Sequence, residues 1–237
     1  MRLIFELDIP NKELEYNYRV IILSFLKKSL EEYNYALKEM VYEIGNQKEM
    51  TFSPFFSVEK LDDIHKKIIL KSEKMKVYIS FNDFNLGFHF FNALNKMKNK
   101  KYFYKGKVLI LKTVKEIKEK RIEVDRATFK LMSPMIIREG IEDHENCYHL
   151  LDENGINVWK CNLVNSLKNI FPEEELKKVE IYPLDVKKTT IDNYGNKIQG
   201  TLGTVILTGH RKILEYLYKT GLSTSKNFIG FGMAEVL

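Results

Sequence analysis

The spacing of apolar residues in the first half of the chain changes between the period of a strand and that of a helix. Residues 2–8 alternate loosely, which predicts a strand, and the period becomes helical from about residue 18. A second short helix is expected at 34–43. The apolar face of the first helix is expected to comprise Ile22, Leu26, Leu30 and Tyr33.

Three further strands and one more helix are expected before the middle of the chain. Pro54 cannot donate to a strand ladder, so its strand is expected at a sheet edge or a bulge. Asn82 or Asp83 caps the helix that follows the next strand. The strands are expected at 51–57, 76–81 and roughly 103–117, and the helix is expected to turn Phe84, Phe88, Phe91 and Leu94 to the core.

The second half follows the same order of elements. The highly charged stretch 115–121 is expected to link two domains, and a new strand pattern begins at 127–134. A helix with Cys161, Val164, Leu167 and Ile170 on its apolar face is expected to stop at Pro172. The remaining elements are expected as strands near 178–188, 201–208 and 229–236 and as a helix at 210–220, with Gly221 as its C′ residue.

The order β-α-β-β-α-β is that of the ferredoxin-like fold and of the RRM, an RNA-binding module. The sequence therefore predicts an α+β protein with two tandem ferredoxin-like (RRM-like) domains, 1–120 and 121–237. No residue-level repeat is visible, so the duplication is inferred from the order of elements alone.

The amino-acid composition indicates which class of partner the protein binds. The chain has 237 residues, 44% of them hydrophobic, which is enough for a sizeable core. Its net charge of +6 favours an anionic partner, such as nucleic acid, over a cationic one. The two cysteines form no CxxC, which argues against a zinc site. The N-terminus is not a signal peptide and no stretch is long and apolar enough to span a bilayer, so we expect a cytoplasmic protein with no membrane partner.

The stretch from Gly221 to Gly232 joins the last expected helix to the last strand. Glycine lets backbone N–H groups approach a phosphate closely, and Lys226 adds a positive charge. Such a loop can hold an RNA backbone without reading its bases. The same residues also fit a plain turn, which local chemistry alone favours. The candidate RNA-binding residues are Gly221, Ser223, Ser225, Lys226, Asn227, Gly230 and Gly232.

His210 and Arg211 begin the last expected helix and bring basic groups to the C-terminal region. They are further candidate RNA contacts. The other histidines, including His149, have no spacing typical of metal ligands, and surface positions are expected for those of the second half.

The C-terminal loop and several shorter segments together resemble one known family. The loop matches that family at Gly221 and at the closing Gly230-Phe231-Gly232, with Ser223 where a second glycine is usual. Residues 48–53 and 131–134 are similar to its Lys-x-Phe-Thr-Phe-Ser and Leu-Ser-Pro segments. The chain thus resembles the CRISPR-associated repeat-processing endoribonucleases, the sixth Cas protein family of the RAMP superfamily.

This resemblance implies a metal-independent endoribonuclease in CRISPR RNA maturation, with no cofactor. The 2′-OH of the RNA attacks the adjacent phosphate and leaves a 2′,3′-cyclic phosphate. In many members of the family the catalytic residues resemble a set of one tyrosine, one histidine and one lysine. Here Lys48 occupies the lysine position, Tyr42 replaces the expected histidine, and Lys27 or Lys28 matches the tyrosine. The implied partners are CRISPR repeat RNA and other Cas proteins of an effector complex, for a monomer or a homodimer.

The missing histidine leaves three outcomes open. The enzyme works with lysines and Tyr42, it binds repeat RNA without cutting it, or a distant histidine supplies the chemistry. A cluster of lysines would lower the pKa of each member. Lys27 and Lys28 also fit solvated i,i+4 pairs with Glu31 and Glu32. A ferredoxin-like interaction protein with no RNA role is the remaining alternative.

Overall fold

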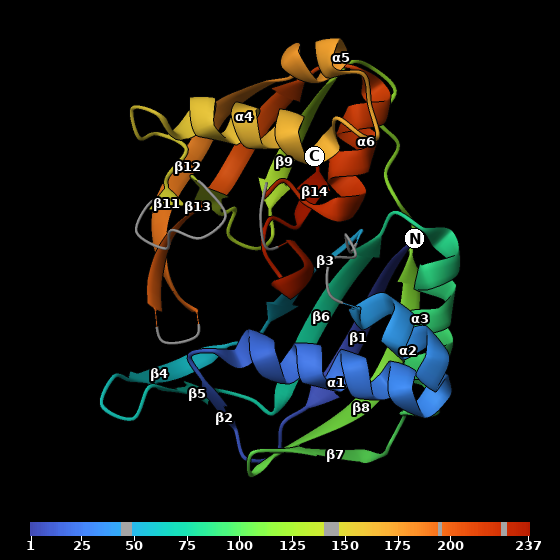
Figure 1. The fold of residues 1–237 in the computed structure, drawn as a ribbon. Coiled ribbons are helices and arrows are strands. Elements are labelled where there is room, and N and C mark those ends of the chain that lie inside the picture. The colour runs from blue at the N-terminus through green and yellow to red at the C-terminus, as the bar shows by residue number, and fades with distance from the viewer. Residues whose placement is uncertain (44–48, 140–146, 194–195, 224–226) are drawn as a thin grey trace. The chain divides into compact units, whose positions relative to one another are not determined.

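The computed structural model divides into two compact units, Met1–Lys118 and Glu119–Leu237 (Figure 1). It describes residues 1–43, 49–139, 147–193, 196–223 and 227–237. In this part of the chain no helix is long and apolar enough to cross a membrane.

The first unit contains a five-stranded antiparallel sheet in the order β3-β6-β1-β8-β7. When the edge strand β7 is left out and the other four strands are numbered along the chain, they lie in the order 2-3-1-4, which is the ferredoxin-like order and confirms the predicted fold class. Strand β3 is an edge strand, as Pro54 requires. The predicted strand at 103–117 is a hairpin in the structure. The five strands are β1 (Arg2–Asp8), β3 (Met50–Phe55), β6 (Lys74–Phe81), β7 (Lys101–Tyr104) and β8 (Lys107–Ile117).

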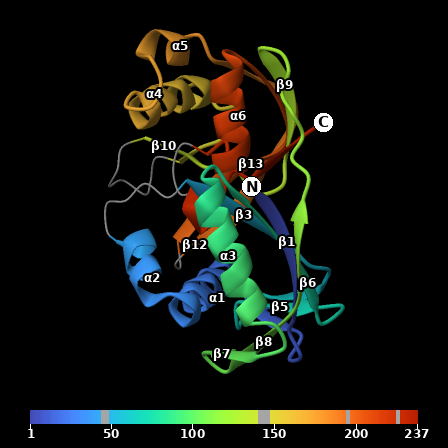
Figure 2. The ribbon, with the colours of Figure 1, turned by 90° about the vertical axis from the view of Figure 1, so that its right-hand side faces the viewer.

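Helices α1 (Tyr18–Tyr33) and α3 (Phe84–Lys96) lie on one side of this sheet (Figure 2). Strand β1 turns Leu3, Phe5 and Leu7 toward the helices, and all three are fully buried. Phe25 of α1 packs against Phe5, with ring centroids 6.3 Å apart. A second short helix, α2 (Tyr35–Tyr42), follows α1 as the sequence predicts.

The predicted apolar face of α3 is partly wrong, although Leu94 is fully buried as predicted. Phe84 and Phe88 are 61% and 49% exposed, whereas Gly87 and Phe90 are buried. The helix carries aromatic residues around most of its circumference, so a spacing of four residues fits two faces. Gly87 decides between them, because a Cβ there would lie 2.9 Å from the Cβ of Met1, and only this face can approach the first strand closely.

A small three-stranded sheet lies beside the main one in the first unit, in the order β2-β5-β4. The Glu13 carboxylate accepts hydrogen bonds from Lys67 at 3.0 Å and Lys107 at 3.2 Å, which ties this sheet to β8. These two lysines lower the pKa of Glu13. The strands are β2 (Glu13–Glu15), β4 (Val58–Asp62) and β5 (Lys67–Leu70).

The second unit repeats the topology of the first. Its four-stranded sheet has the order β12-β13-β9-β14, which is again 2-3-1-4 along the chain. The predicted last strand at 229–236 is shorter than expected, because residues 227–229 form a 3₁₀ turn. The strands are β9 (Arg126–Leu131), β12 (Glu180–Asn193), β13 (Asn196–Thr208) and β14 (Ala234–Val236), and β10 (Ile137–Arg138) pairs with β11 (Cys147–Tyr148).

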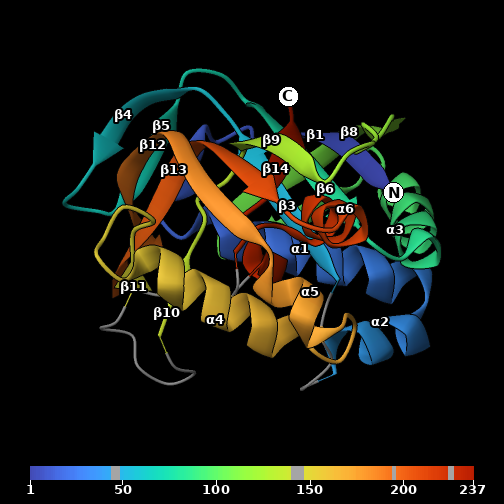
Figure 3. The same cartoon turned by 90° about the horizontal axis from the view of Figure 1, so that it is seen from above.

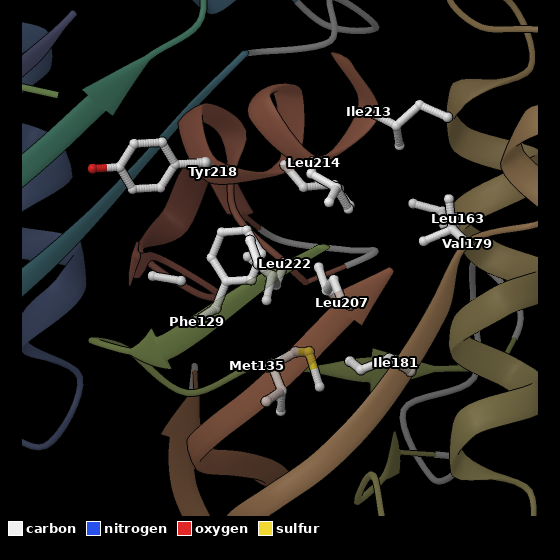
Figure 4. Packing of buried hydrophobic residues seen from close by; sticks show 14 of the residues in the cluster. Phe129, Met135, Leu163, Val179, Ile181, Leu207, Ile213, Leu214, Tyr218 and Leu222 are labelled. Carbon is white, nitrogen blue, oxygen red and sulfur yellow. The ribbon is translucent and has the colours of Figure 1, made fainter. Parts of the chain in front are cut away.

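Helices α4 (Gly155–Leu167) and α6 (Arg211–Thr220) cover one face of this sheet, with α5 (Glu173–Lys177) next to α4 (Figure 3). The predicted apolar face of α4 is partly wrong, since Cys161 is exposed. Trp159 takes the core position instead, fully buried, and its indole N–H donates to the Leu222 carbonyl at 2.9 Å. Figure 4 shows Phe129, Leu207 and Leu214 meeting in the core between sheet and helices.

His149 lies in the core of the second unit and not at the surface, so the expectation for this histidine is wrong. Its side chain is 1% exposed, and Nδ1 accepts from the backbone N–H of Leu151 at 3.1 Å. The segment is held further by Asp152, whose carboxylate accepts from the His149 N–H at 2.6 Å and from Lys188 Nζ at 2.5 Å. Burial lowers the pKa of the His149 imidazole.

This histidine makes the stability of the second unit depend on pH. The unfolded imidazole has a pKa of about 6.5 and the folded one lies lower, so between the two values the unfolded chain binds more protons. The free energy of unfolding is therefore expected to fall as pH drops from 7.5 to 5.5. Chemical denaturation at both pH values measures this, and His149→Asn, which keeps an acceptor for Leu151, should have the smaller difference. An equal difference in both proteins contradicts the assignment to His149.

Candidate functional site

The turn between α1 and α2 decides which side chains meet in the first unit. The backbone N–H of Asn34 donates to the Leu30 carbonyl at 2.7 Å and ends α1. The side chain of the same residue accepts from the Leu37 N–H at 3.0 Å and caps α2. One asparagine therefore ends one helix and begins the next, and α2 packs back along α1.

This packing brings together two of the predicted catalytic residues. The ammonium nitrogen of Lys27 lies 5.5 Å from the centroid of the Tyr42 ring. Lys27 is exposed on α1, whereas Tyr42 is half-buried at the end of α2 and its hydroxyl oxygen is buried. A cation over an aromatic face is attracted by the ring quadrupole, so the tyrosine holds the lysine while its charge stays in solvent.

The protonation of Tyr42 limits what it can do. Burial raises the pKa of this phenol well above its ordinary value. The hydroxyl therefore stays protonated at neutral pH and cannot act as a general base. Because the hydroxyl is also buried, the ring is the part of Tyr42 that reaches another candidate group.

Lys28 is placed differently. Its ammonium lies 3.2 Å from Glu31 and 3.1 Å from Glu32, on an exposed part of α1. The hydrogen bond that Lys28 donates to Glu32, followed by the one it donates to Glu31, raises the pKa of Lys28. A lowered pKa was expected for a lysine cluster, and for Lys28 that expectation is wrong because two carboxylates face it.

Glu39 is a neighbour of this site that the sequence did not single out. Its carboxylate pairs with Lys38, which lowers the pKa of Glu39 most, and the charge of Lys27 lowers it further. Lys38 in turn lies 4.4 Å from the centroid of the Tyr35 ring. The sequence could have indicated Glu39, because it precedes Tyr42 by three residues on the same short helix, and side chains at that spacing share a face.

Lys48, the fourth predicted catalytic residue, lies outside the described residues. The same holds for Ser225 and Lys226 of the C-terminal loop. Their predicted roles stay predictions.

Three glycines of the loop have backbone angles that favour glycine. Gly221 ends α6 with φ +101°, and Gly230 and Gly232 have φ of +90° and +70°. The two arms of the loop meet where the Leu222 N–H donates to the Gly232 carbonyl at 2.7 Å. A Cβ on Gly232 would lie 2.3 Å from the backbone nitrogen of Ser223, so only glycine fits between these arms.

Two predicted RNA-binding side chains in the loop point into the protein. The Ser223 hydroxyl is buried and accepts from the backbone N–H of Ile136 at 2.8 Å. The Asn227 amide donates to the Gly221 carbonyl at 3.2 Å. In this structure both side chains hold the loop in shape. The expectation that the glycines free backbone N–H groups for a phosphate is wrong for the described ones, since the N–H groups of Gly221, Gly230 and Gly232 all donate to carbonyls of the protein.

His210 and Arg211 lie at the other end of α6 from the loop. His210 is the N-cap of α6, its ring accepting from the Lys212 N–H at 3.3 Å, and Arg211 lies 3.8 Å from Glu215. Both are exposed. The ten residues of α6 span about 15 Å, so the structure does not bring this pair to the glycine loop.

The second unit matches a family model described as "CRISPR associated protein Cas6, C-terminal", over residues 115–236. This match covers half of the chain. The chain belongs to the Cas6 family. Membership supports a role in CRISPR processing and confirms the resemblance inferred from the sequence.

Comparison with solved structures shows the fold over the whole length of this chain. One, described as "An RAMP protein binding different RNA substrates", has a TM-score of 0.79 at 19% identity and covers 100% of this chain and 99% of its own. A Cas6-related protein from Pyrococcus furiosus has a TM-score of 0.80 at 19% identity, with 100% and 98% covered. At such identity the likeness establishes the fold. A search of curated protein sequences finds no significant match.

Proposed function

We propose that this Cas6-family protein cuts precursor CRISPR RNA within its repeats, by attack of a 2′-OH on the adjacent phosphate and without a metal ion. The observation that supports cleavage is the exposed Lys27 ammonium held 5.5 Å over the ring of Tyr42. A fixed cation at a surface that binds RNA can stabilise the charge that develops on a phosphate during cleavage. The position of Tyr42 is the one where the resemblance places a histidine.

In the proposed reaction the bond from the 2′ oxygen to phosphorus forms and the bond to the 5′ oxygen breaks. Lys27 contacts a non-bridging oxygen of the pentacoordinate phosphate and stabilises its negative charge. A second ammonium group, that of Lys48, donates a proton to the departing 5′ oxygen, and the 2′ proton passes to solvent. Tyr42 acts as a positioning residue in this proposal, since its hydroxyl oxygen is buried.

The second unit holds the RNA in this proposal. Lys226 of the glycine loop contacts the phosphate backbone. Ser223 and Asn227 act by shaping the loop, while His210 and Arg211 contact the RNA at the far end of α6. The relatives' descriptions support an RNA ligand, since they name an RNA-binding RAMP protein and a Cas6 product complex.

A cleavage assay on repeat RNA tests the proposal. The protein is expected to yield a product with a 2′,3′-cyclic phosphate at an unchanged rate when a chelator is added. A 2′-deoxy substitution at the scissile nucleotide is expected to abolish cutting while binding persists, because the nucleophile is lost and the phosphates remain. Saturable binding without product would support the alternative of a catalytically inactive repeat-RNA-binding member, and absence of binding would support a protein without an RNA role.

A further inference from the structure

In the first unit a depression is lined by residues of β2, of the beginning of α1 and of the hairpin of β7 and β8. Figure 1 labels these elements. The volume of the depression is about 70 Å³ and it opens to solvent, so a ligand there would be only partly enclosed. None of the predicted catalytic or RNA-binding residues that the structure describes is among its lining residues. The residues that line it are Leu14, Glu15, Asn17, Tyr18, Val20, Ile21, Tyr104, Lys105 and Lys107.

Its lining combines flat apolar walls with a charged and polar edge. Leu14 and Ile21 are buried and form an apolar floor. Two tyrosines, Tyr18 and Tyr104, contribute aromatic rings. The ring of Tyr18 is fixed by the edge-on ring of Phe56 at 5.0 Å, so this wall is rigid before any ligand arrives.

The polar edge carries groups of both signs. The ammonium of Lys105 lies 5.7 Å from the centroid of the Tyr104 ring and is exposed. Asn17 is the N-cap of α1, yet its side chain makes no cap hydrogen bond, which leaves the amide available. Glu15 is exposed and presents a carboxylate, which only accepts hydrogen bonds when ionised. Apolar faces, a hydrogen-bonding edge and a nearby cation together fit a nucleobase and its phosphate.

One residue that lines the depression, Val20, shares a face of α1 with Lys27, whereas Tyr18 and Ile21 line it from other faces. Val20, which lines it, precedes Lys27 by seven residues, so the two lie almost on one face of the helix and about 10 Å apart along its axis. A strand of RNA with its scissile phosphate at Lys27 could therefore reach the depression with a neighbouring nucleotide.

We propose that this depression receives one unpaired base of the repeat RNA, a few nucleotides from the scissile phosphate, an inference that rests on the proposed function. The base stacks on Tyr104, its phosphate lies at Lys105, and Glu15 accepts a hydrogen bond from the base. The one N–H that uracil can donate is flanked by two carbonyls, which repel a carboxylate, so the site favours a base with an exocyclic amino group over uracil.

Repeat RNAs with a single abasic nucleotide, placed at each unpaired position in turn, test this proposal through their affinity. One position is expected to lose about tenfold in affinity for the wild-type protein, the size of one lost stacking contact. Tyr104→Ala is expected to bind this abasic RNA as tightly as it binds the intact RNA, because the stacking contact is already lost. Phe103→Ala is the matched control, because Phe103 is 68% exposed and lies next to Tyr104 on the opposite face of β7.

Glu15→Gln provides a second variant that keeps the aromatic walls. This variant is expected to lose about tenfold in affinity for the abasic RNA, as the wild type does. It is also expected to discriminate less against RNA with uracil at that position. If the wild-type protein binds repeat RNA, but an abasic nucleotide costs wild type and Tyr104→Ala the same affinity at every position, the base site is overturned and the proposed function stays in place. Wild-type protein that neither binds nor cuts repeat RNA overturns both.

Discussion

Replacing Lys27 by alanine is expected to slow single-turnover cleavage of repeat RNA about a hundredfold, with little loss of binding. The ammonium of Lys27 is exposed and held against Tyr42, so it can meet the charge that develops on the phosphate only in the transition state. One lost contact among many phosphate contacts changes affinity much less. The rate with saturating protein, measured beside the dissociation constant, separates these two effects.

Lys28→Ala is the matched control on the next position of the helix. Its ammonium is paired with Glu31 and Glu32, and its raised pKa reflects that pairing. Loss of such an exposed pair is expected to change the cleavage rate less than about threefold. If Lys28→Ala slows cleavage as much as Lys27→Ala, the assignment of the chemistry to Lys27 is wrong.

Two substitutions of Tyr42 separate its ring from its hydroxyl. Tyr42→Phe keeps the aromatic face under Lys27 and is expected to cut at nearly the wild-type rate. Tyr42→Leu removes the ring that holds Lys27 and is expected to cut more slowly. A rate for Tyr42→Phe as low as that of Lys27→Ala would mean that the hydroxyl takes part in the reaction.

Gly232→Ala is expected to be the most damaging single change in the C-terminal loop. Its φ of +70° is costly for alanine, and its Cβ would lie 2.3 Å from the Ser223 nitrogen, which is backbone and cannot rotate away. Strain and clash together are expected to lower the free energy of unfolding by about 3 kcal/mol. The loop is also expected to bind RNA about tenfold more weakly, because the clash changes its shape. Thermal unfolding and RNA titration measure the two effects.

Gly106→Ala separates the cost of the backbone angle from that of the clash. Gly106 has a similar φ of +75°, but a Cβ there would meet no atom within 4 Å. This substitution is expected to cost only about 1 kcal/mol. Equal losses of stability in the two variants would show that crowding between the loop arms contributes nothing.

The order of elements could be predicted from the sequence, but the buried faces of two helices could not. Strand periods, Pro54 at a sheet edge and Asp83 as a cap are local signals, and the structure confirms each. Helix α3 has aromatic residues on more than one face, so the choice between Phe88 and Phe90 depended on which face the sheet could approach. That choice is made by tertiary packing, which no local pattern contains.

The candidate site was predictable to a similar extent. The sequence singled out both Lys27 and Tyr42, yet nothing in it stated that α2 would return along α1 and bring them within contact. Ser223 was chosen as a polar loop residue. Its hydroxyl is instead occupied by the N–H of Ile136, a partner 87 residues away that local sequence does not indicate.

The repeated 2-3-1-4 strand order means that each compact unit contains every strand of its own main sheet. A chain broken between Lys118 and Glu119 therefore interrupts neither sheet. Two such fragments, each fused to one half of an inducible dimeriser, would allow fragment complementation, in which RNA cutting depends on an added small molecule.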